Sequence, residues 1–227
     1  MGRRSLLLLL SALMLGACGN SPAADPGQVL KDAASAMAAV KTVQADVAFG
    51  PGAKVLGFDL LSATGKVKRP SDSDTVGKVK AAGTVLQPEL VTVGGKFYLR
   101  EAQFLPFHEL TGTEAVDYPN AGRLLDTQHG VTAVLPKGKS PSLVGSEPID
   151  GHDCNKVTAT YAPDALNDAL APIKLTDDVQ ATLWIDKDSK LVRRVKLSGH
   201  LFDPATNSFV DVRLHDFNTA VDITSPA

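Results

Sequence analysis

Residues 178–217, DVQATLWIDKDSKLVRRVKLSGHLFDPATNSFVDVRLHDF, contain three runs in which apolar and polar side chains alternate. Such alternation is typical of β-strands that bury one face. The links between the runs are Lys187-Asp188-Ser189 and residues 203–207, and both are rich in turn-forming residues. Strands joined by such short links pair in antiparallel fashion. The sequence therefore predicts an antiparallel meander in this part of the chain.

Further strands are predicted upstream of the meander. The runs VQADVAFG (43–50), LLSATGKVKR (60–69) and DTVGKVKAAGTV (74–85) alternate in the same way. ELVTVGGKFYLRE (89–101) has two apolar runs around Gly94-Gly95, and SLVGSEPIDGHDCNKVTATYA (142–162) has two strand-like halves around Asp150-Gly151. Both glycine-containing links predict hairpins.

Helices are predicted at three points among these strands. Asp25-Pro26 forms a helix start, and the apolar residues that follow it recur at helical spacing to about residue 41. Residues 118–138 predict two short helices divided by Gly130, and residues 162–173 predict one more. Helices inserted between runs of strands usually cover one face of the sheet. The expected fold class is therefore α+β, with one large, mostly antiparallel sheet.

The N-terminal region predicts a lipoprotein signal. Arg3 and Arg4 precede an apolar core at residues 6–15, which is too short to span a bilayer because a helix needs about 20 apolar residues for that. Residues 15–18, LGAC, resemble a bacterial lipobox, in which cleavage precedes a cysteine that then carries lipid. This interpretation divides the chain into a signal peptide (1–17), a lipidated Cys18 with a flexible tether (18–24), and one domain (25–227).

The predicted anchor determines where the protein would lie. Diacylglycerol and acyl groups on Cys18 would hold it on the extracytoplasmic side of the cell membrane, since two or more chains give stable attachment. The alternative is a soluble secreted protein with an incidental cysteine near its cleavage site. With Cys18 lipidated, Cys154 has no intramolecular disulfide partner, because the chain has two cysteines.

Composition and motifs argue against several functions. The chain has 227 residues, a net charge of −2 and no basic block, so nucleic acid is not an expected partner. Known catalytic, nucleotide-binding and zinc motifs are absent from the sequence, and no enzyme activity, metal or cofactor is predicted. His152, Asp153 and Cys154 are adjacent, but neighbouring strand residues point to opposite faces and do not converge on one site. A monomer is expected.

Small residues are frequent on the strand faces that are expected to point inward. They are Ala45, Ala63, Gly65, Gly77, Ala81, Ala159, Ala181 and Gly199. Aromatic residues make up 5% of the chain, so few large side chains are present to fill the space over the sheet. Protein interiors are densely packed. Either the helices close down on the sheet, or an apolar ligand occupies the space between them.

Four segments in order give the chain a family resemblance. They are LVTVGGKFYL, YPNAGRLLDTQHGVTAVL, the IDG turn before a threonine-rich strand, and ATLWID before the closing strands. Together they resemble the LppX/LprA/LprF/LprG lipoprotein family of mycobacteria and related actinobacteria, from the lipobox to about Phe217. The resemblance implies a strongly curved antiparallel half-barrel with helices on its concave face, similar to LolA and LolB. It also implies a cavity that holds a multi-acyl lipid or glycolipid for transport across the cell envelope, with a lipid exporter as a possible partner.

The resemblance supplies candidate cavity-lining positions rather than catalytic residues. They are Met37, Val40, Val47, Val91, Val93, Leu99, Leu124, Leu125, Val131, Leu135, Leu183 and Leu197. A lipid carrier is the first functional hypothesis. The alternative is a membrane-tethered surface protein with a filled core that acts through protein contacts. A hydrolase is a third hypothesis, and no motif supports it.

Overall fold

The computed structural model describes residues 24–226. The predicted signal peptide (1–17), Cys18 and all of the tether except Ala24 lie outside the described residues. Within residues 24–226, no helix has the length and apolar character needed to cross a membrane.

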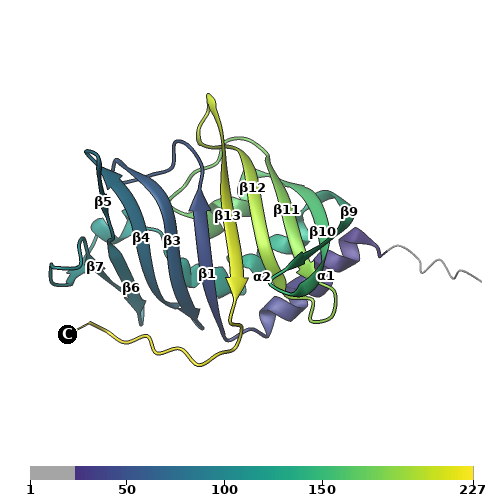
Figure 1. The fold of residues 1–227 in the computed structure, drawn as a ribbon, viewed down its shortest axis with the longest axis horizontal. Coiled ribbons are helices and arrows are strands. Elements are labelled where there is room, and N and C mark those ends of the chain that lie inside the picture. The colour runs from purple at the N-terminus through teal and green to yellow at the C-terminus, as the bar shows by residue number, and fades with distance from the viewer. Residues whose placement is uncertain (1–23, 227) are drawn as a thin grey trace, which may run out of the picture.

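One large antiparallel sheet contains all of the strands in this part of the chain (Figure 1). Its strands are β1 (Thr42–Phe49), β2 (Lys54–Val55), β3 (Phe58–Lys68), β4 (Asp72–Ala81), β5 (Thr84–Leu86), β6 (Glu89–Val93), β7 (Lys96–Arg100), β8 (His108–Leu110), β9 (Lys139–Ile149), β10 (His152–Tyr161), β11 (Val179–Asp186), β12 (Val192–Asp203) and β13 (Thr206–His215). The strand order is β8-β7-β6-β4-β3-β1-β13-β12-β11-β10-β9, with β2 on β3 and β5 on β4. The sheet is curved and does not close, since its edges are β8 and β9.

The predicted meander is the β11-β12-β13 unit. Ala181 pairs with Leu197, and Leu197 pairs with Val210, so three apolar side chains form one row on one face of the sheet. β1 then pairs with β13 on one side and with β3 on the other. The pairing of β1 with β13 joins the two halves of the sheet, and these two strands come from opposite ends of the described chain.

The helices lie on one face of the sheet, behind it in the view of Figure 1. They are α1 (Pro26–Ala38), η1 (Glu114–Asp117), η2 (Ala121–Leu125), α2 (Val131–Val134), η3 (Leu135–Lys137) and α3 (Pro163–Leu170), where η marks a 3-10 helix. The two helices predicted within residues 118–138 are thus η2 and α2 with η3, separated at Gly130. The fold class predicted from the sequence is confirmed.

The first helix begins where the sequence indicates. The Asp25 carboxylate accepts a hydrogen bond of 3.0 Å from the Gly27 amide, and Pro26 occupies the first helical position. At the other end, the Arg69 guanidinium donates to the carbonyl oxygens of Met37 and Val40. Arg69 follows β3, so this contact fixes the end of α1 to the sheet and satisfies carbonyls that lack a partner within the helix.

A β-bulge in β3 changes one predicted face. Alternation in LLSATGKVKR predicts that Leu61 shares a face with Ala63. The pairing of β3 with β4 shifts between Leu60 and Ser62, and Leu61 is 42% exposed. The extra residue at a bulge breaks the strict alternation of side chains. Leu60, rather than Leu61, therefore lies on the concave face with Ala63.

A buried carboxylate fixes the β11-β12 turn. Asp186 Oδ1 accepts from the amides of Asp188 and Ser189 at 2.9 and 3.1 Å, and Asp186 Oδ2 lies 2.9 Å from Arg193 Nη2. Burial by itself raises the pKa of this carboxyl, but the hydrogen bonds from Ser189, Arg193 and Asp188 outweigh burial and lower it from 3.8 to about 2. The ionised form is therefore the one that stabilises the fold.

Acid should destabilise the protein partly through Asp186. Because its folded-state pKa is lowered, its contribution is complete above its ordinary pKa of 3.8 and is lost as the pH falls to about 2. We expect Asp186→Asn to remove on the order of 1–2 kcal/mol of stability at neutral pH and to flatten the stability curve in that acid range. Denaturant unfolding at several pH values measures this, with Asp188→Asn as the control on the same turn. An unchanged acid profile in Asp186→Asn would contradict it.

Candidate functional site

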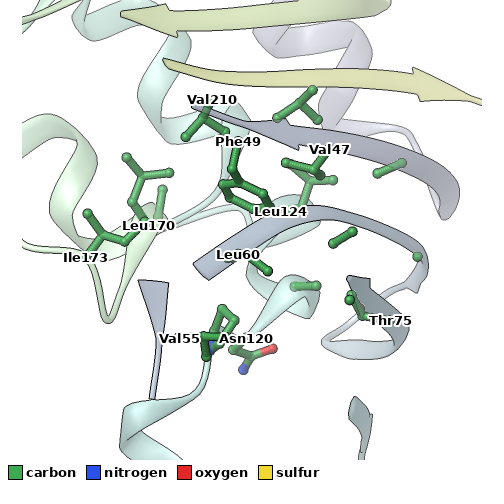
Figure 2. Close-up of a pocket in the computed structure, with 18 of the residues that line it drawn as sticks. Val47, Phe49, Val55, Leu60, Thr75, Asn120, Leu124, Leu170, Ile173 and Val210 are labelled. Carbon is green, nitrogen blue, oxygen red and sulfur yellow. The ribbon is translucent and has the colours of Figure 1, made fainter. Parts of the chain in front are cut away.

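An apolar cavity of about 410 Å³ lies between the concave face of the sheet and the helical segments that cover it. Strands β1–β7 and β10–β13 contribute side chains to one wall, and segment 118–135 and the α3 region form the other. Figure 2 shows side chains from both walls, among them Phe49 and Leu60 from the sheet and Leu124, Leu170 and Ile173 from the helical side. The volume lies within the range of about 300–1,000 Å³ that is usual for ligand pockets.

Small residues on the sheet create the space. Val47 pairs with Ala63, Ala63 pairs with Gly77, and all three line the cavity. In the next row, Ala45 pairs with Gly65. The alanines and glycines of these two rows present only methyl groups or hydrogens. The sheet and the helices therefore leave room between them at these positions. The sequence expectation that small inward residues accompany a space over the sheet is met at these positions.

The β2-β3 hairpin forms part of the cavity mouth. Leu56 and Phe58 line the cavity and are nevertheless 54% and 45% exposed. Leu56 is the first residue of a two-residue turn, Leu56-Gly57, and Phe58 follows that turn; both turn residues have positive φ, at 48° and 85°. Those angles are typical of a type I′ turn, which closes tightly twisted hairpins. Apolar side chains at this turn therefore face both the interior and solvent.

Few polar residues line the cavity. Glu101, Tyr118 and Asn120 are among the lining residues, and the Asn120 side chain accepts from the Gly122 amide at 3.0 Å. Burial raises the pKa of the Tyr118 phenol, and the nearby Glu101 carboxylate raises it further, so the phenol stays protonated at neutral pH. Thr75 also lines the cavity, and its buried hydroxyl has no hydrogen-bond partner among the described residues. These groups can hydrogen-bond to a ligand, but the surrounding wall is apolar.

The helical wall depends on close packing at Gly130. A Cβ atom placed there would lie 2.3 Å from the carbonyl oxygen of Arg123 and 2.6 Å from that of Asp126, so no other residue fits without movement of the backbone. Gly130 thus does more than divide two helices, because it lets η2 and α2 pack against each other. Nearby, the buried Tyr161 hydroxyl donates to the Leu135 carbonyl at 3.2 Å and ties this wall to β10.

Seven of the sequence-predicted positions line the cavity. They are Val47, Leu99, Leu124, Val131, Leu135, Leu183 and Leu197. They come from four strands and three helical segments that are far apart in the sequence, and the fold places them around one space. That they contact lipid stays a prediction.

Three predicted positions in or just after helices do not line the cavity. Met37, Val40 and Leu125 are at most 1% exposed and belong to the packed core. For Met37 the reason is that α1 packs against α2, η3 and β9, so these elements cover its apolar face before it could reach the cavity. Helical spacing correctly predicts that these side chains are buried but does not show what covers them.

Val91 and Val93 do not line the cavity either, for a different reason. In the β6-β7 hairpin Leu90 pairs with Leu99, and both line the cavity. Val91 and Val93 are the next residues in alternation, so their side chains point to the opposite face. Both faces of ELVTV are apolar, and alternation alone does not indicate which of them points inward. A shift of one residue reverses the assignment.

Several lining residues were not among the candidates. They are Phe49, Val55, Leu60, Leu170, Ile173, Val195, Val210, Val212 and Leu214, with others of the hairpins and loops. The alternation in NSFVDVRLHDF contains the signal for Val210, Val212 and Leu214. By contrast, nothing local indicates that Leu170 and Ile173, at the end of α3 and beyond it, close the cavity.

Several titratable residues of the described region lie outside the cavity, and their contacts are structural. Cys154 is buried, and burial raises the pKa of its thiol, which keeps the sulfur protonated and unreactive. His152 Nδ1 lies 3.0 Å from Asp186 Oδ2 and thus belongs to the turn network. Among residues 24–226, no group of three metal-ligating side chains comes together. The cavity is the feature of this region with the geometry of a ligand site, and its chemistry suits apolar binding.

Comparisons with known proteins agree with this architecture. The chain is 27% identical over 222 residues to the lipoarabinomannan carrier protein LprG of Mycobacteroides abscessus. This alignment covers 96% of this chain and 93% of LprG. The crystal structure of LprF from Mycobacterium bovis superposes with a TM-score of 0.71 at 20% identity, covering 89% of this chain and 97% of LprF. LppX from Mycobacterium tuberculosis gives a TM-score of 0.62 at 18% identity, covering 88% of this chain and 98% of LppX. The family model for the LppX_LprAFG lipoproteins matches residues 25–223, and the chain therefore belongs to that family.

Proposed function

We propose that this protein is a non-enzymatic lipid carrier of the cell envelope. It binds a multi-acyl lipid or glycolipid in the cavity between sheet and helices and carries it across the envelope. The observation that carries the proposal is the apolar cavity of about 410 Å³ with an apolar mouth. Its relatives named lipoarabinomannan carrier protein support a glycolipid as the cargo class.

Binding needs no bond-making in this proposal. Each methylene group removed from water contributes roughly 0.8 kcal/mol, so acyl chains supply most of the affinity. The polar groups near Glu101, Tyr118 and Asn120 then meet the linkage or headgroup. A ligand held in this way leaves slowly by itself, which is why a lipid exporter or an acceptor membrane belongs to the proposed cycle.

Lipid extraction tests the proposal directly. The full-length protein, purified from the envelope of an actinobacterial host in a mild detergent, should carry non-covalent lipid in a stoichiometric amount. Native mass spectrometry followed by extraction separates this lipid from any lipid attached covalently. Repeated absence of non-covalent lipid would favour the alternative, a tethered surface protein that acts through protein contacts.

The proposed anchor is tested separately at Cys18. We expect Cys18→Ala to abolish incorporation of a palmitate analogue, because the acylated thiol is removed, while Cys154→Ala leaves incorporation unchanged. The non-covalent lipid of the cavity should persist in Cys18→Ala. Intact-protein mass spectrometry reports the covalent mass, and extraction reports the cargo. Loss of both lipids in Cys18→Ala would mean that anchor and cavity are not independent.

A further inference from the structure

We propose that the cavity mouth docks on an anionic phospholipid bilayer through the tips of the β2-β3 and β4-β5 hairpins. This docking surface consists of Leu56, Phe58 and Val85, with Lys54 and Lys80 beside them. The inference rests on the proposed carrier function and adds the place where cargo passes between cavity and membrane. It concerns the folded surface and is independent of the anchor at Cys18.

The apolar part of the surface is continuous with the cavity. Leu56 and Phe58 belong to the cavity wall, and Val85 is 53% exposed on the neighbouring hairpin. β3 pairs with both β2 and β4, and β5 pairs with β4, so the two hairpin tips lie at the same end of the sheet (Figure 1). An acyl chain that leaves at this point passes the exposed apolar side chains of the hairpin tips. A bilayer on the mouth would let it pass without exposure to water.

The conformation of Leu56 is a second, independent observation. Its φ of 48° lies in the left-handed region, which is unfavourable for a bulky residue and in type I′ turns is usually occupied by Asn, Asp or Gly. Strained residues of this kind gather at functional sites. A leucine at the tip of this turn is therefore unfavourable for folding on two grounds, since it is also 54% exposed. Insertion into a membrane accounts for the exposed side chain and gives a reason for a leucine to stand where Asn, Asp or Gly would be less strained.

The charges near the mouth favour an anionic membrane. Lys54 pairs with Asp59, and Asp59 pairs with Lys80, so two lysines flank one aspartate on the outer face of these strands. Lys78 follows the same outer face on β4. Asp203 lies on a different hairpin, β12-β13, where its carboxylate accepts from the Ala205 amide at 2.7 Å and keeps its negative charge. On the outer face of β2–β4, three lysines therefore stand against one aspartate, and this excess of positive charge attracts anionic headgroups.

Site-specific quenching tests the proposal on the full-length, membrane-reconstituted protein. A bimane reporter at Thr84→Cys, next to Val85, should be quenched by lipids with brominated acyl chains in vesicles of phosphatidylcholine and phosphatidylglycerol. A reporter at Ser146→Cys, on β9 at the opposite edge of the sheet, should not be quenched. Cys154 is buried and does not take up the label. Vesicles of phosphatidylcholine alone should give weaker quenching at Thr84.

Two asparagine variants separate docking from folding. Leu56→Asn should abolish quenching at Thr84 without lowering the melting temperature, because asparagine tolerates the left-handed turn position. Ala82→Asn occupies the equivalent position of the β4-β5 turn, where φ is 47°, and should leave quenching intact. Quenching that is equal at Thr84 and Ser146, or that survives in Leu56→Asn, would overturn the proposal.

The same samples distinguish failure of docking from failure of lipid carriage. Extracted non-covalent lipid together with absent quenching at Thr84 would overturn the docking surface and leave the carrier function standing. Quenching at Thr84 without any extracted lipid would support docking and overturn carriage.

Discussion

Ala63→Trp is expected to abolish lipid loading while leaving the protein folded. Ala63 lies on β3 between Val47 and Gly77, and its methyl group faces the cavity. Ala63 and its side-chain-free partner Gly77 both line the cavity of about 410 Å³, so an indole at position 63 can enter that space. Because it would occupy the volume that acyl chains need, we expect non-covalent lipid to fall from a stoichiometric amount to a trace.

The matched control for this variant is Ala48→Trp on the adjacent strand. Ala48 is exposed and lies next to Val47 in alternation, so its side chain points away from the cavity. Native mass spectrometry gives the lipid content of each protein, and circular dichroism with thermal melting confirms folding. Full lipid content in folded Ala63→Trp, or an equal loss in Ala48→Trp, would show that lipid is bound elsewhere.

Leu125→Ala is expected to have the largest effect on stability and little effect on lipid loading. Leu125 is completely buried in the core, and truncation of such a leucine costs about 2–5 kcal/mol because it leaves a cavity behind. Its neighbour Leu124 lines the lipid cavity and is only partly buried. Leu124→Ala should therefore cost less stability but reduce the lipid retained per folded molecule.

This pair of variants is informative because the residues are adjacent in η2. Denaturant unfolding gives the free energy of each variant, and lipid extraction from the folded fraction gives its loading. The opposite pattern, in which Leu125→Ala loses lipid and keeps its stability, would mean that the cavity extends beneath η2. In that case Met37 and Val40, which were predicted to line it, would need to be tested as lining residues.

Much of the local structure follows from the sequence. Asp25-Pro26 starts α1, Gly94-Gly95 and Asp150-Gly151 form hairpin turns, and the three closing strands occur where alternation predicts them. These features depend on residues within a few positions of each other, because turn conformation, capping and side-chain period are local properties. The resemblance to a lipoprotein family likewise follows from segments of the sequence and agrees with the matched family.

The site was predicted less completely than the elements that form it. Val47, Leu183 and Leu197 lie on strands with one clearly apolar face, and they line the cavity as expected. Val91 was assigned to the wrong face because both faces of β6 are apolar. Met37 is predicted to line the cavity but belongs to the packed core. A helical pattern shows that a residue is buried, but it does not show which element covers it.

The sequence alone determines the strands, turns and helix starts, because these depend on interactions between residues close together in the chain. It also determines the family, because the family resemblance depends on short segments of sequence. The tertiary structure adds the bulge that turns Leu61 outward, the burial of α1 beneath α2, and the meeting of two hairpin tips at the cavity mouth. Each of these depends on pairing or packing between segments that are distant in the sequence. Such contacts determine which face of the sheet borders the cavity. The cavity, in turn, gives this antiparallel sheet a candidate binding site.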